Sequence, residues 1–231
     1  MLEIVIATRN RHKLRELKVL LALRRIRWRS LADFPRLSAV KERGRTFDAN
    51  AIHKAQAVAR ATGRLALADD SGLEVTALGG APGVRSARFS GRHGNDGANN
   101  EKVLRMLSGL PASRRGARYR CSLALAGPSG LVAVARGMWR GRIATTSRGR
   151  RGFGYDPIFF IPRAGKTVGQ LPVVLKQRLS HRADAARRLR PLLAQLASGR
   201  KGPVARGAVR AVSGSSSGGR GGDRRGPARP P

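Results

Sequence analysis

The sequence is poor in cysteine and has no long hydrophobic run. Cys121 is the only cysteine of 231 residues, which excludes an intrachain disulfide and a zinc site built on several cysteines. Residues 118–126 around it alternate as in a strand, so we expect a buried thiol rather than a nucleophile. No run approaches the roughly 18 apolar residues of a membrane helix, and Met1 to Ala7 lacks the basic start of a signal peptide. We therefore expect a cytoplasmic protein without membrane contact.

Acidic and aromatic residues are also scarce. Asp and Glu number 13 against 47 Lys and Arg, giving a net charge of +34, which predicts attraction to phosphate groups of any kind. Aromatic residues make up only 4%, so stacking on nucleic-acid bases is poorly provided for. The 41% hydrophobic content suffices for one globular domain, which we place at residues 1–198. The Gly-, Arg-, Ser- and Pro-rich tail 199–231 is predicted to be disordered.

Hydrophobic periodicity predicts strands and helices in alternation. The expected strands are Leu2 to Ala7, Ile26 to Ser30, Leu65 to Ala68, Tyr119 to Ala126 and Leu131 to Arg136. The expected helices are residues 14–21, 47–62, 99–107 and a last one capped by Ser180 that is kinked or restarted at Pro191. Alternation indicates a parallel sheet, and the Gly127 to Gly130 turn adds an antiparallel hairpin. The fold class is therefore α/β, with a mixed central sheet flanked by helices.

The most informative segment runs from Leu65 to Gly72, where a short apolar strand is expected to end in Asp69-Asp70-Ser71. Carboxylates at the end of a buried strand can hold a divalent cation and meet a polyphosphate. Adjacent residues of a strand point to opposite sides, so only one of the two aspartates is expected to face a cleft. The alternative is structural: an aspartate that caps a turn at Ser71-Gly72.

Three further segments carry polar chemistry, and each has a structural alternative. Residues 8–13 lie between a strand and a helix, where they can form a phosphate cradle or simply an ordinary helix start. Residues 151–159 place two glycines around Phe153, which suits a stacked flat ligand or plain hairpin packing. Ser180-His181-Arg182 opens a helix, so that His181 and Arg182 form an anion site or remain solvated side chains.

In combination these segments resemble the family of non-canonical purine nucleoside triphosphate pyrophosphatases, the inosine/xanthosine triphosphatases. The resemblance covers residues 2–197. It is carried by Thr8-x-Asn10-x-x-Lys13, Thr46-Phe47-x-x-Asn50-Ala51, Ala68-Asp69-Asp70-Ser71-Gly72-Leu73, Gly79-Gly80-Ala81-Pro82-Gly83, Gly152-Phe153-Gly154-Tyr155-Asp156-Pro157 and Ser180-His181-Arg182. It implies two lobes with a substrate cleft between them, a homodimer, and magnesium-dependent hydrolysis of dITP/ITP and XTP/dXTP to the monophosphate and pyrophosphate, which removes these nucleotides from the pool.

The resemblance also implies residue roles. Asp70 would be the catalytic carboxylate that binds Mg²⁺ and activates the water that attacks the α-phosphorus. The residues implied in substrate binding are Thr8, Arg9, Asn10, Arg11, His12, Lys13, Lys54, Ser71, Phe153, Gly154, Tyr155, Asp156, Lys176, His181 and Arg182. The family usually places acidic residues before the Gly-x-Thr-Phe segment; here only Glu42 is present, which makes Glu42 the candidate second metal ligand.

A second hypothesis follows from the charge alone. The chain could be a nucleic-acid-binding protein whose Arg- and Gly-rich tail makes the main contact. The two functions are compatible, because the tail could tether an enzyme near polyanions without taking part in catalysis.

Overall fold

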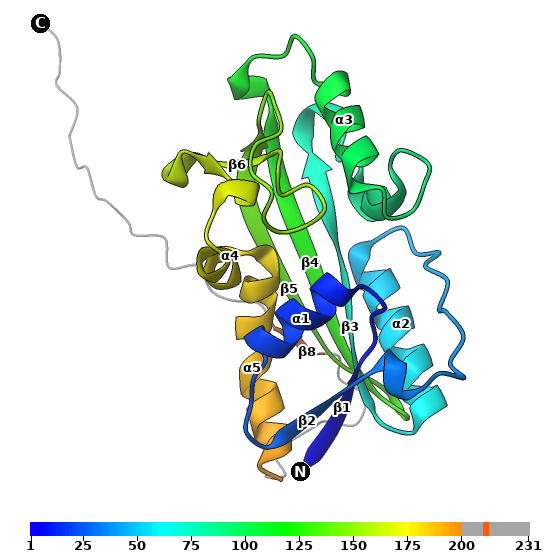
Figure 1. Ribbon diagram of the computed structural model, residues 1–231. Coiled ribbons are helices and arrows are strands. Elements are labelled where there is room, and N and C mark those ends of the chain that lie inside the picture. The colour runs from blue at the N-terminus through cyan, green and yellow to red at the C-terminus, as the bar shows by residue number, and fades with distance from the viewer. Residues whose placement is uncertain (200–209, 213–231) are drawn as a thin grey trace, which may run out of the picture.

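The computed structural model describes residues 1–199 and 210–212. The chain folds around one mixed sheet (Figure 1). Its strands are β1 (Leu2–Ile6), β2 (Ile26–Ser30), β3 (Leu65–Val75), β4 (Gly116–Gly127), β5 (Gly130–Ile143), β6 (Phe159–Ile161), β7 (Lys166–Thr167) and β8 (Arg210–Val212). The helices are α1 (Arg11–Leu20), α2 (Phe47–Thr62), α3 (Asp96–Met106), α4 (Val173–Leu179) and α5 (His181–Ala197).

The strand order, β2-β1-β3-β4-β5-β6-β7, creates an opening beside β3. β1 is parallel to both β2 and β3, whereas β3, β4 and β5 form antiparallel pairs. β1 pairs with β3 only as far as Leu67, while β3 continues to Val75 against β4. Residues of β3 beyond Leu67 therefore have no β1 residue beside them, and functional side chains can gather there.

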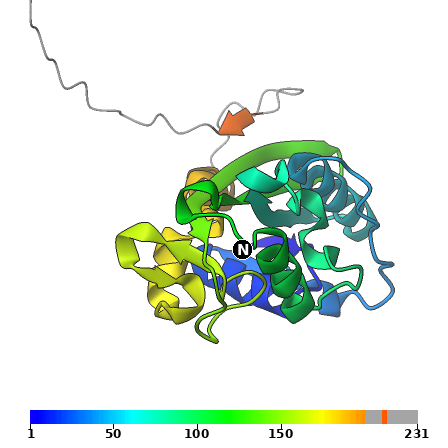
Figure 2. The same ribbon diagram turned by 90° about the horizontal axis from the view of Figure 1, so that it is seen from above.

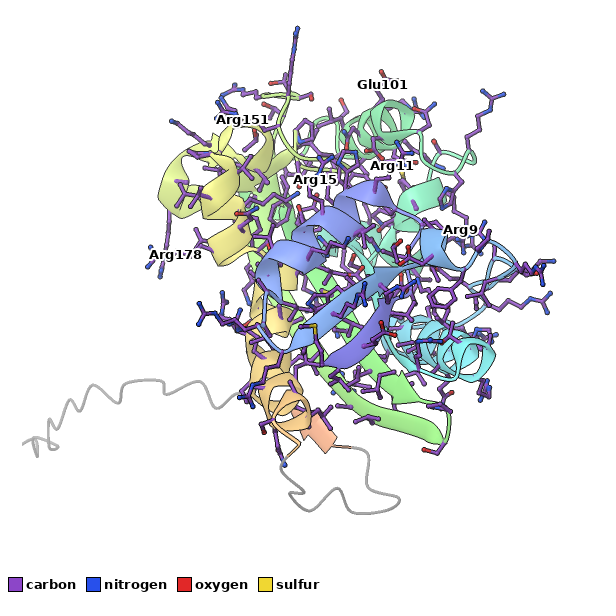
Figure 3. The ribbon with its side chains drawn as sticks, turned by 60° about the horizontal axis from the view of Figure 1, so that its bottom comes forward. Arg9, Arg11, Arg15, Glu101, Arg151 and Arg178 are labelled. Atoms are coloured by element: carbon purple, nitrogen blue, oxygen red, sulfur yellow. The ribbon has the colours of Figure 1, made fainter. Side chains whose placement is uncertain are left out.

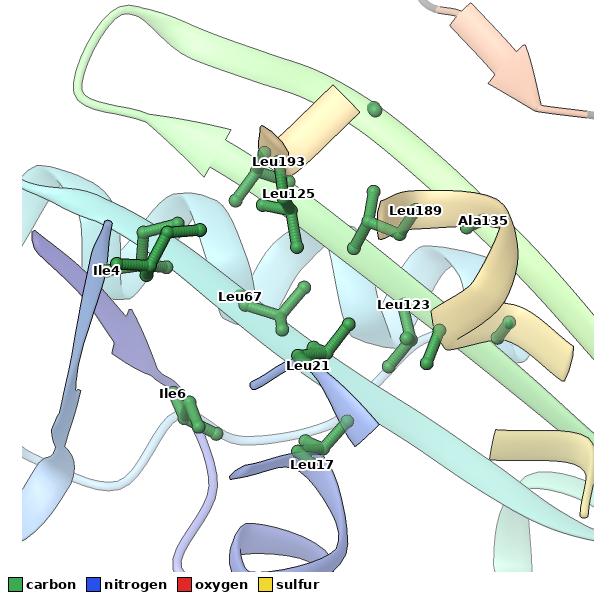
Figure 4. Packing of buried hydrophobic residues seen from close by; sticks show 14 of the residues in the cluster. Ile4, Ile6, Leu17, Leu21, Leu67, Leu123, Leu125, Ala135, Leu189 and Leu193 are labelled. Atoms are coloured by element: carbon green, nitrogen blue, oxygen red, sulfur yellow. The ribbon is translucent and has the colours of Figure 1, made fainter. Parts of the chain in front are cut away.

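Helices cover both faces of the sheet. α1 and α5 lie on one face and α2 on the other, as Figures 1 and 2 show from two directions. On the first face Leu17 of α1 and Leu21, which directly follows α1, pack with Leu189 and Leu193 of α5 over the sheet (Figure 4). On the second face α2 presents small residues, Ala51, Ala55 and Ala59, which let the helix approach the sheet closely.

A separate apolar cluster fills the other end of the sheet. Leu73 and Val75 of β3 pack there with Tyr119 of β4 and with Ile158 and Phe159. The long strands β3, β4 and β5 run from one cluster to the other and join the two lobes (Figure 1). The predicted mixed α/β architecture is confirmed.

Most expected elements are present, with two corrections. The expected turn after Asp70 is absent, because β3 continues through Ser71 and Gly72 to Val75 and pairs with β4 along this length. The last helix does not restart at Pro191, since α5 runs unbroken from His181 to Ala197. Ser180 caps α5 as predicted, its side chain accepting a hydrogen bond from the Ala183 amide.

Within residues 1–199 and 210–212, none of the helices combines the length and apolar character needed to cross a bilayer. The predicted disordered tail lies outside the described residues, apart from Gly199 and the backbone of β8. β8 pairs in parallel with Ala133 to Ala135 of β5, a strand that the sequence did not predict.

Candidate active site

A cavity of about 690 Å³ opens where β3 extends beyond the end of β1. Its walls come from the β1–α1 connection, α2, β3, the 3₁₀ helix Gly83–Arg88, the loop at Phe153, and the start of α5. A volume of this size is typical of small-molecule sites. Four of the six motifs that the sequence analysis quoted thus line this cavity, namely those at residues 8–13, 68–73, 152–157 and 180–182.

Asp70 lies on the wall of this cavity and is only 5% exposed. Asn50 of α2 donates a hydrogen bond from Nδ2 to Asp70 Oδ2 at 2.9 Å, and the Ser71 amide donates to Oδ1 at 3.1 Å. Burial raises the pKa of Asp70 to about 6, and this holds even though Lys13 acts to lower it. The result is a carboxylate that titrates close to neutrality, as a proton acceptor in catalysis requires.

Glu42 and Lys54 form an ion pair beside Asp70. Burial acts to raise the pKa of Glu42, but the Lys54 charge outweighs it and the pKa is lowered. Lys54 Nζ also donates to the backbone oxygen of Asp69 at 3.0 Å. The predicted phosphate-binding lysine and the predicted second metal ligand therefore lie together on the cavity wall.

Asp69 does not line the cavity but holds the cations that do. Its carboxylate lies 2.6 Å from Lys13 Nζ and accepts hydrogen bonds from Arg182 Nε at 2.8 Å and Ser71 Oγ at 2.9 Å. Burial acts to raise the pKa of Asp69, but Arg182 and Lys13 hold it well below its usual range. The expectation that only one of the two aspartates faces the cleft is confirmed.

The polar loop before α1 contributes unevenly. Asn10 caps α1, because its Oδ1 accepts hydrogen bonds from the amides of His12 at 2.9 Å and Lys13 at 3.0 Å. The alternative of an ordinary helix start therefore applies to this side chain. Thr8, Arg9, Asn10 and Lys13 line the cavity. Arg9 is exposed and donates to the backbone oxygen of Leu37 at 2.7 Å.

Two residues of this loop do not reach the cavity wall. Arg11 is exposed on α1 (Figure 3). His12 is also exposed and instead stacks on Phe153, with ring centroids 5.1 Å apart. The expectation that Arg11 and His12 bind substrate directly is therefore not supported by their positions.

The loop from Phe153 to Asp156 is fixed by several hydrogen bonds. Asp156 Oδ2 accepts from the Phe153 amide at 2.9 Å, and a Cβ on Gly152, whose φ is +81°, would meet this oxygen at 1.9 Å. The Gly154 amide donates to Asp96 of α3 at 2.6 Å, and Tyr155 Oη donates to the Ser86 carbonyl at 2.8 Å. These contacts leave Phe153 on the cavity wall.

Lys176 and Arg182 form the cationic end of the site near Phe153. Lys176 Nζ lies 2.5 Å from Asp156 and 4.3 Å from the centre of the Phe153 ring. The Arg182 guanidinium carbon lies 5.7 Å from the same centre. Glu16 of α1 accepts from both cations, at 2.9 Å from Lys176 Nζ and 2.5 Å from an Arg182 terminal nitrogen.

His181 is buried between these groups. Its ring stacks on Tyr119 with centroids 4.6 Å apart, and its Nδ1 has no hydrogen-bond partner within the described residues. Burial lowers the pKa of His181 well below its usual value, and Arg182 adds to this effect. The imidazole is therefore neutral at physiological pH and forms part of the cavity wall.

Sequence reasoning gave no role to three residues that the structure brings to the site: Glu16, Asn50 and Asp96. Asn50 belongs to a quoted motif, so its position was marked although its contact with Asp70 was not. Glu16 and Asp96 carried one available signal, since acidic side chains are rare in this chain. Each holds a cation or a loop of the cavity wall in place.

The donor set suits a hard divalent cation that is bound partly by substrate. No group of three or more His, Cys, Asp or Glu side chains in the described part of the chain is arranged to hold a metal ion. Asp70 and Glu42 are the two carboxylates beside each other on the cavity wall. Mg²⁺ is commonly held by one or two carboxylates together with substrate phosphates and water, so these residues fit it.

Comparison with known proteins shows extensive similarity. A profile of the Ham1 family matches residues 4–192. A dITP/XTP pyrophosphatase of Geobacillus kaustophilus is 49% identical over 82% of this chain and 93% of its own length. A dITP/XTP pyrophosphatase of Rhodopirellula baltica is 48% identical over 85% of this chain and 95% of its own length. The solved structure of a HAM1 protein from Coxiella burnetii has a TM-score of 0.77 at 40% identity, covering 84% of this chain and all of the other.

Proposed function

The chain belongs to the Ham1 family, and we propose that Asp70 is the catalytic carboxylate of its pyrophosphatase reaction. The protein is a hydrolase that cleaves non-canonical purine nucleoside triphosphates, dITP/ITP and XTP/dXTP, to the monophosphate and pyrophosphate. The observation that carries the assignment of Asp70 is its position, with a pKa of about 6, on the wall of a cavity that four of the family's motifs line.

Asp70 is proposed to accept a proton from the attacking water. The water oxygen forms a bond to the α-phosphorus, the bond from that phosphorus to the bridging oxygen breaks, and pyrophosphate leaves. Asn50 and the Ser71 amide hold the Asp70 carboxylate in one orientation by the two hydrogen bonds described above. This fixed orientation supports catalysis by positioning, which is the protein's main contribution to phosphoryl chemistry.

Mg²⁺ is the proposed metal, with Asp70 and Glu42 as its protein ligands. When bound, such an ion neutralises charge that builds up on the phosphate oxygens. Lys13 and Lys54 add positive charge on the same wall, and Thr8 offers a hydroxyl. Because Lys54 already pairs with Glu42, we expect metal binding to loosen that ion pair and free Lys54 for phosphate.

The base is proposed to stack on Phe153, near Lys176, His181 and Arg182. Three of the five N–H groups of Arg182 serve Asp69, Glu16 and Ser71, which leaves two. Lys176 keeps one of three donors after Asp156 and Glu16. Spare donors suit the 6-oxo acceptor of hypoxanthine and xanthine and oppose the 6-amino donor of adenine.

The test compares nucleotides and products. Purified protein with Mg²⁺ should convert ITP and XTP to monophosphate and pyrophosphate far faster than ATP, and EDTA should stop turnover until Mg²⁺ is restored. Asp70→Asn should abolish turnover while the protein stays folded. Equal rates on ITP and ATP, orthophosphate as the product, or an active Asp70→Asn variant would each contradict the proposal.

The remaining expectations concern assembly and location. We expect a homodimer in the cytoplasm, where the nucleotide pool is found, and a tail that contacts polyanions without base preference. The support is the family resemblance for the dimer and the eight basic residues against one acid in residues 199–231 for the tail. Light scattering of the purified chain measures the first expectation, and the tail is tested by deletion as described below.

A further inference from the structure

Arg88 ends the 3₁₀ helix Gly83–Arg88 and lines the same cavity as Asp70 and Glu42. Its side chain is half-buried, and no ion pair or side-chain hydrogen bond engages it among residues 1–199. The helix carries a second arginine, Arg85, which is exposed and does not line the cavity. Only one of the two arginines therefore faces the place where substrate binds.

Four other cations of the cavity wall are already paired with carboxylates. Lys13 and Arg182 pair with Asp69, Lys54 pairs with Glu42, and Lys176 pairs with Asp156. Ion pairs of this kind neutralise the cations that the site offers to an anionic substrate. Arg88 is the guanidinium of the described cavity wall that keeps its whole donor set for a ligand, since Arg9 spends one donor on a backbone oxygen.

The position of Arg88 along the cavity indicates which part of the substrate it would meet. Phe153, Lys176 and Arg182 mark one end, and Asp70 lies next to Lys13 and Glu42. Arg88 belongs to the side of Asp70 and Glu42, because its 3₁₀ helix is held against Gly72 and Leu73, which follow Asp70 in β3, and it lines the cavity together with Glu42. With the base at Phe153 and the α-phosphorus at Asp70, the groups that extend toward Arg88 are the β- and γ-phosphates.

Arg88 is also held by a well-anchored segment. Ser86 Oγ accepts from the Leu73 amide of β3 at 2.9 Å and donates to the Gly83 carbonyl at 2.6 Å. A Cβ on Gly72 would come within 2.3 Å of this hydroxyl, so the close approach of the 3₁₀ helix to β3 requires glycine there. Tyr155 Oη binds the Ser86 carbonyl from the base side of the cavity. The segment is thus fixed to both halves of the site.

Taking the proposed function as its basis, we infer that Arg88 binds the β- and γ-phosphates of the substrate and holds the pyrophosphate that leaves. A guanidinium matches phosphate oxygens with paired N–H donors and stays charged at all physiological pH values. When the bond between the α-phosphorus and the bridging oxygen breaks, its electron pair goes to pyrophosphate. Arg88 would stabilise that added charge, which makes it a substrate-binding residue that acts on the leaving group.

The experiment compares Arg88→Ala and Arg88→Lys with the matched control Arg85→Ala. Inhibition constants for pyrophosphate and for IMP are measured with Mg²⁺, together with kcat/KM for ITP. Arg88→Ala should weaken pyrophosphate binding about 10- to 100-fold and lower kcat/KM to a similar extent, while IMP binding stays unchanged. Arg88→Lys should recover part of the loss, and Arg85→Ala should behave as the wild type.

Two results would overturn the inference: unchanged pyrophosphate binding in Arg88→Ala, or an equal loss of IMP and pyrophosphate binding. Since Arg88 has no ion-pair or side-chain hydrogen-bond partner among residues 1–199, the melting temperature of Arg88→Ala should match that of the wild type, which separates a binding effect from misfolding. Failure of the wild type to release pyrophosphate from ITP would contradict the proposed function instead. The two failures are therefore distinguishable.

Discussion

Asp69 and Asp70 are adjacent in β3, yet their carboxylates enter different environments. Asp69 meets Lys13 and Arg182 on the face of the sheet that α1 and α5 cover. Asp70 meets Asn50 on the face that α2 covers. The Asp69 carboxylate is stabilised in its charged form because two cations contact it. The Asp70 carboxylate is not, because its contact is the neutral amide of Asn50.

Asp70→Asn should increase the stability of the metal-free protein at neutral pH. The folded-state pKa of Asp70 is raised from 3.8 to about 6, so the favourable contribution of the protonated carboxyl is lost as pH rises through 6. Asn lacks this titration and can still accept from Asn50. At pH 8 the free energy of unfolding should be higher than that of the wild type by up to about 3 kcal/mol, and this difference should vanish near pH 4.

Urea unfolding in EDTA at several pH values measures this gain. Added Mg²⁺ should raise the wild-type stability but not that of Asp70→Asn, since the ion binds only the folded wild type. A metal-free wild type as stable as the variant at pH 8 would contradict the prediction.

Asp69→Asn should have the opposite effect on stability. The pKa of Asp69 is held below its usual range, so its ion pairs stabilise the fold above about pH 4 and are lost as pH falls through the lowered pKa. At pH 7 the substitution leaves the buried Arg182 and the partly buried Lys13 without their shared carboxylate. We expect a loss of about 3–5 kcal/mol in the free energy of unfolding.

The same urea titration at pH 7 measures this loss. The adjacent Asp70→Asn variant serves as the matched control, because it changes the same chemical group one residue away. A loss below about 1 kcal/mol would mean that the buried ion pairs do not hold the site together.

The sequence located the site but not the length of β3. Residues 65–68 are apolar, and the polar residues 69–71 after them resemble a strand end followed by a turn. In the structure β4 pairs with β3 as far as Val75, and this partner lies far along the chain. Local patterns can mark a strand, but its end depends on a neighbour that the local sequence does not reveal.

The contacts of Glu16 and Arg88 escaped sequence reasoning for a related reason. Glu16 contacts Arg182, which lies 166 positions further along the sequence. Arg85 and Arg88 belong to the same short 3₁₀ helix, and only its three-dimensional course places Arg88, and not Arg85, on the cavity wall. Lys13, Asp70 and the Phe153 loop were found because their motifs are contiguous. Asn10 shows the limit of that approach. It caps α1, as an ordinary helix start does, and it also lines the cavity, so both interpretations of this motif apply to it.

Deletion of residues 199–231 should leave kcat/KM for ITP unchanged. Every residue that lines the cavity within the described part of the chain lies between Ala7 and Arg182, so the tail supplies none of them. The deletion should instead weaken binding to RNA or DNA at low salt, because it removes eight basic residues. Gel-shift titrations at two salt concentrations measure this, and lost turnover in the shortened protein would contradict the prediction.

Glu16→Gln should raise KM for ITP about 10-fold with a smaller change in kcat. Glu16 is a positioning residue: it accepts from Lys176 and Arg182 and so fixes the two cations that stand near Phe153. Without its charge both side chains gain freedom, whereas Asp70 keeps its own contacts with Asn50 and Ser71. Binding of the base should therefore suffer more than the chemical step.

The control for this variant is Glu101→Gln, which removes the same charge from an exposed position on α3 (Figure 3). KM is measured for both ITP and XTP. A change in base positioning should alter the ratio of the two KM values, whereas the mere loss of one negative charge should not. If KM and the ITP to XTP ratio stay at wild-type values in Glu16→Gln while only thermal stability falls, Glu16 stabilises the fold without positioning the base-binding cations.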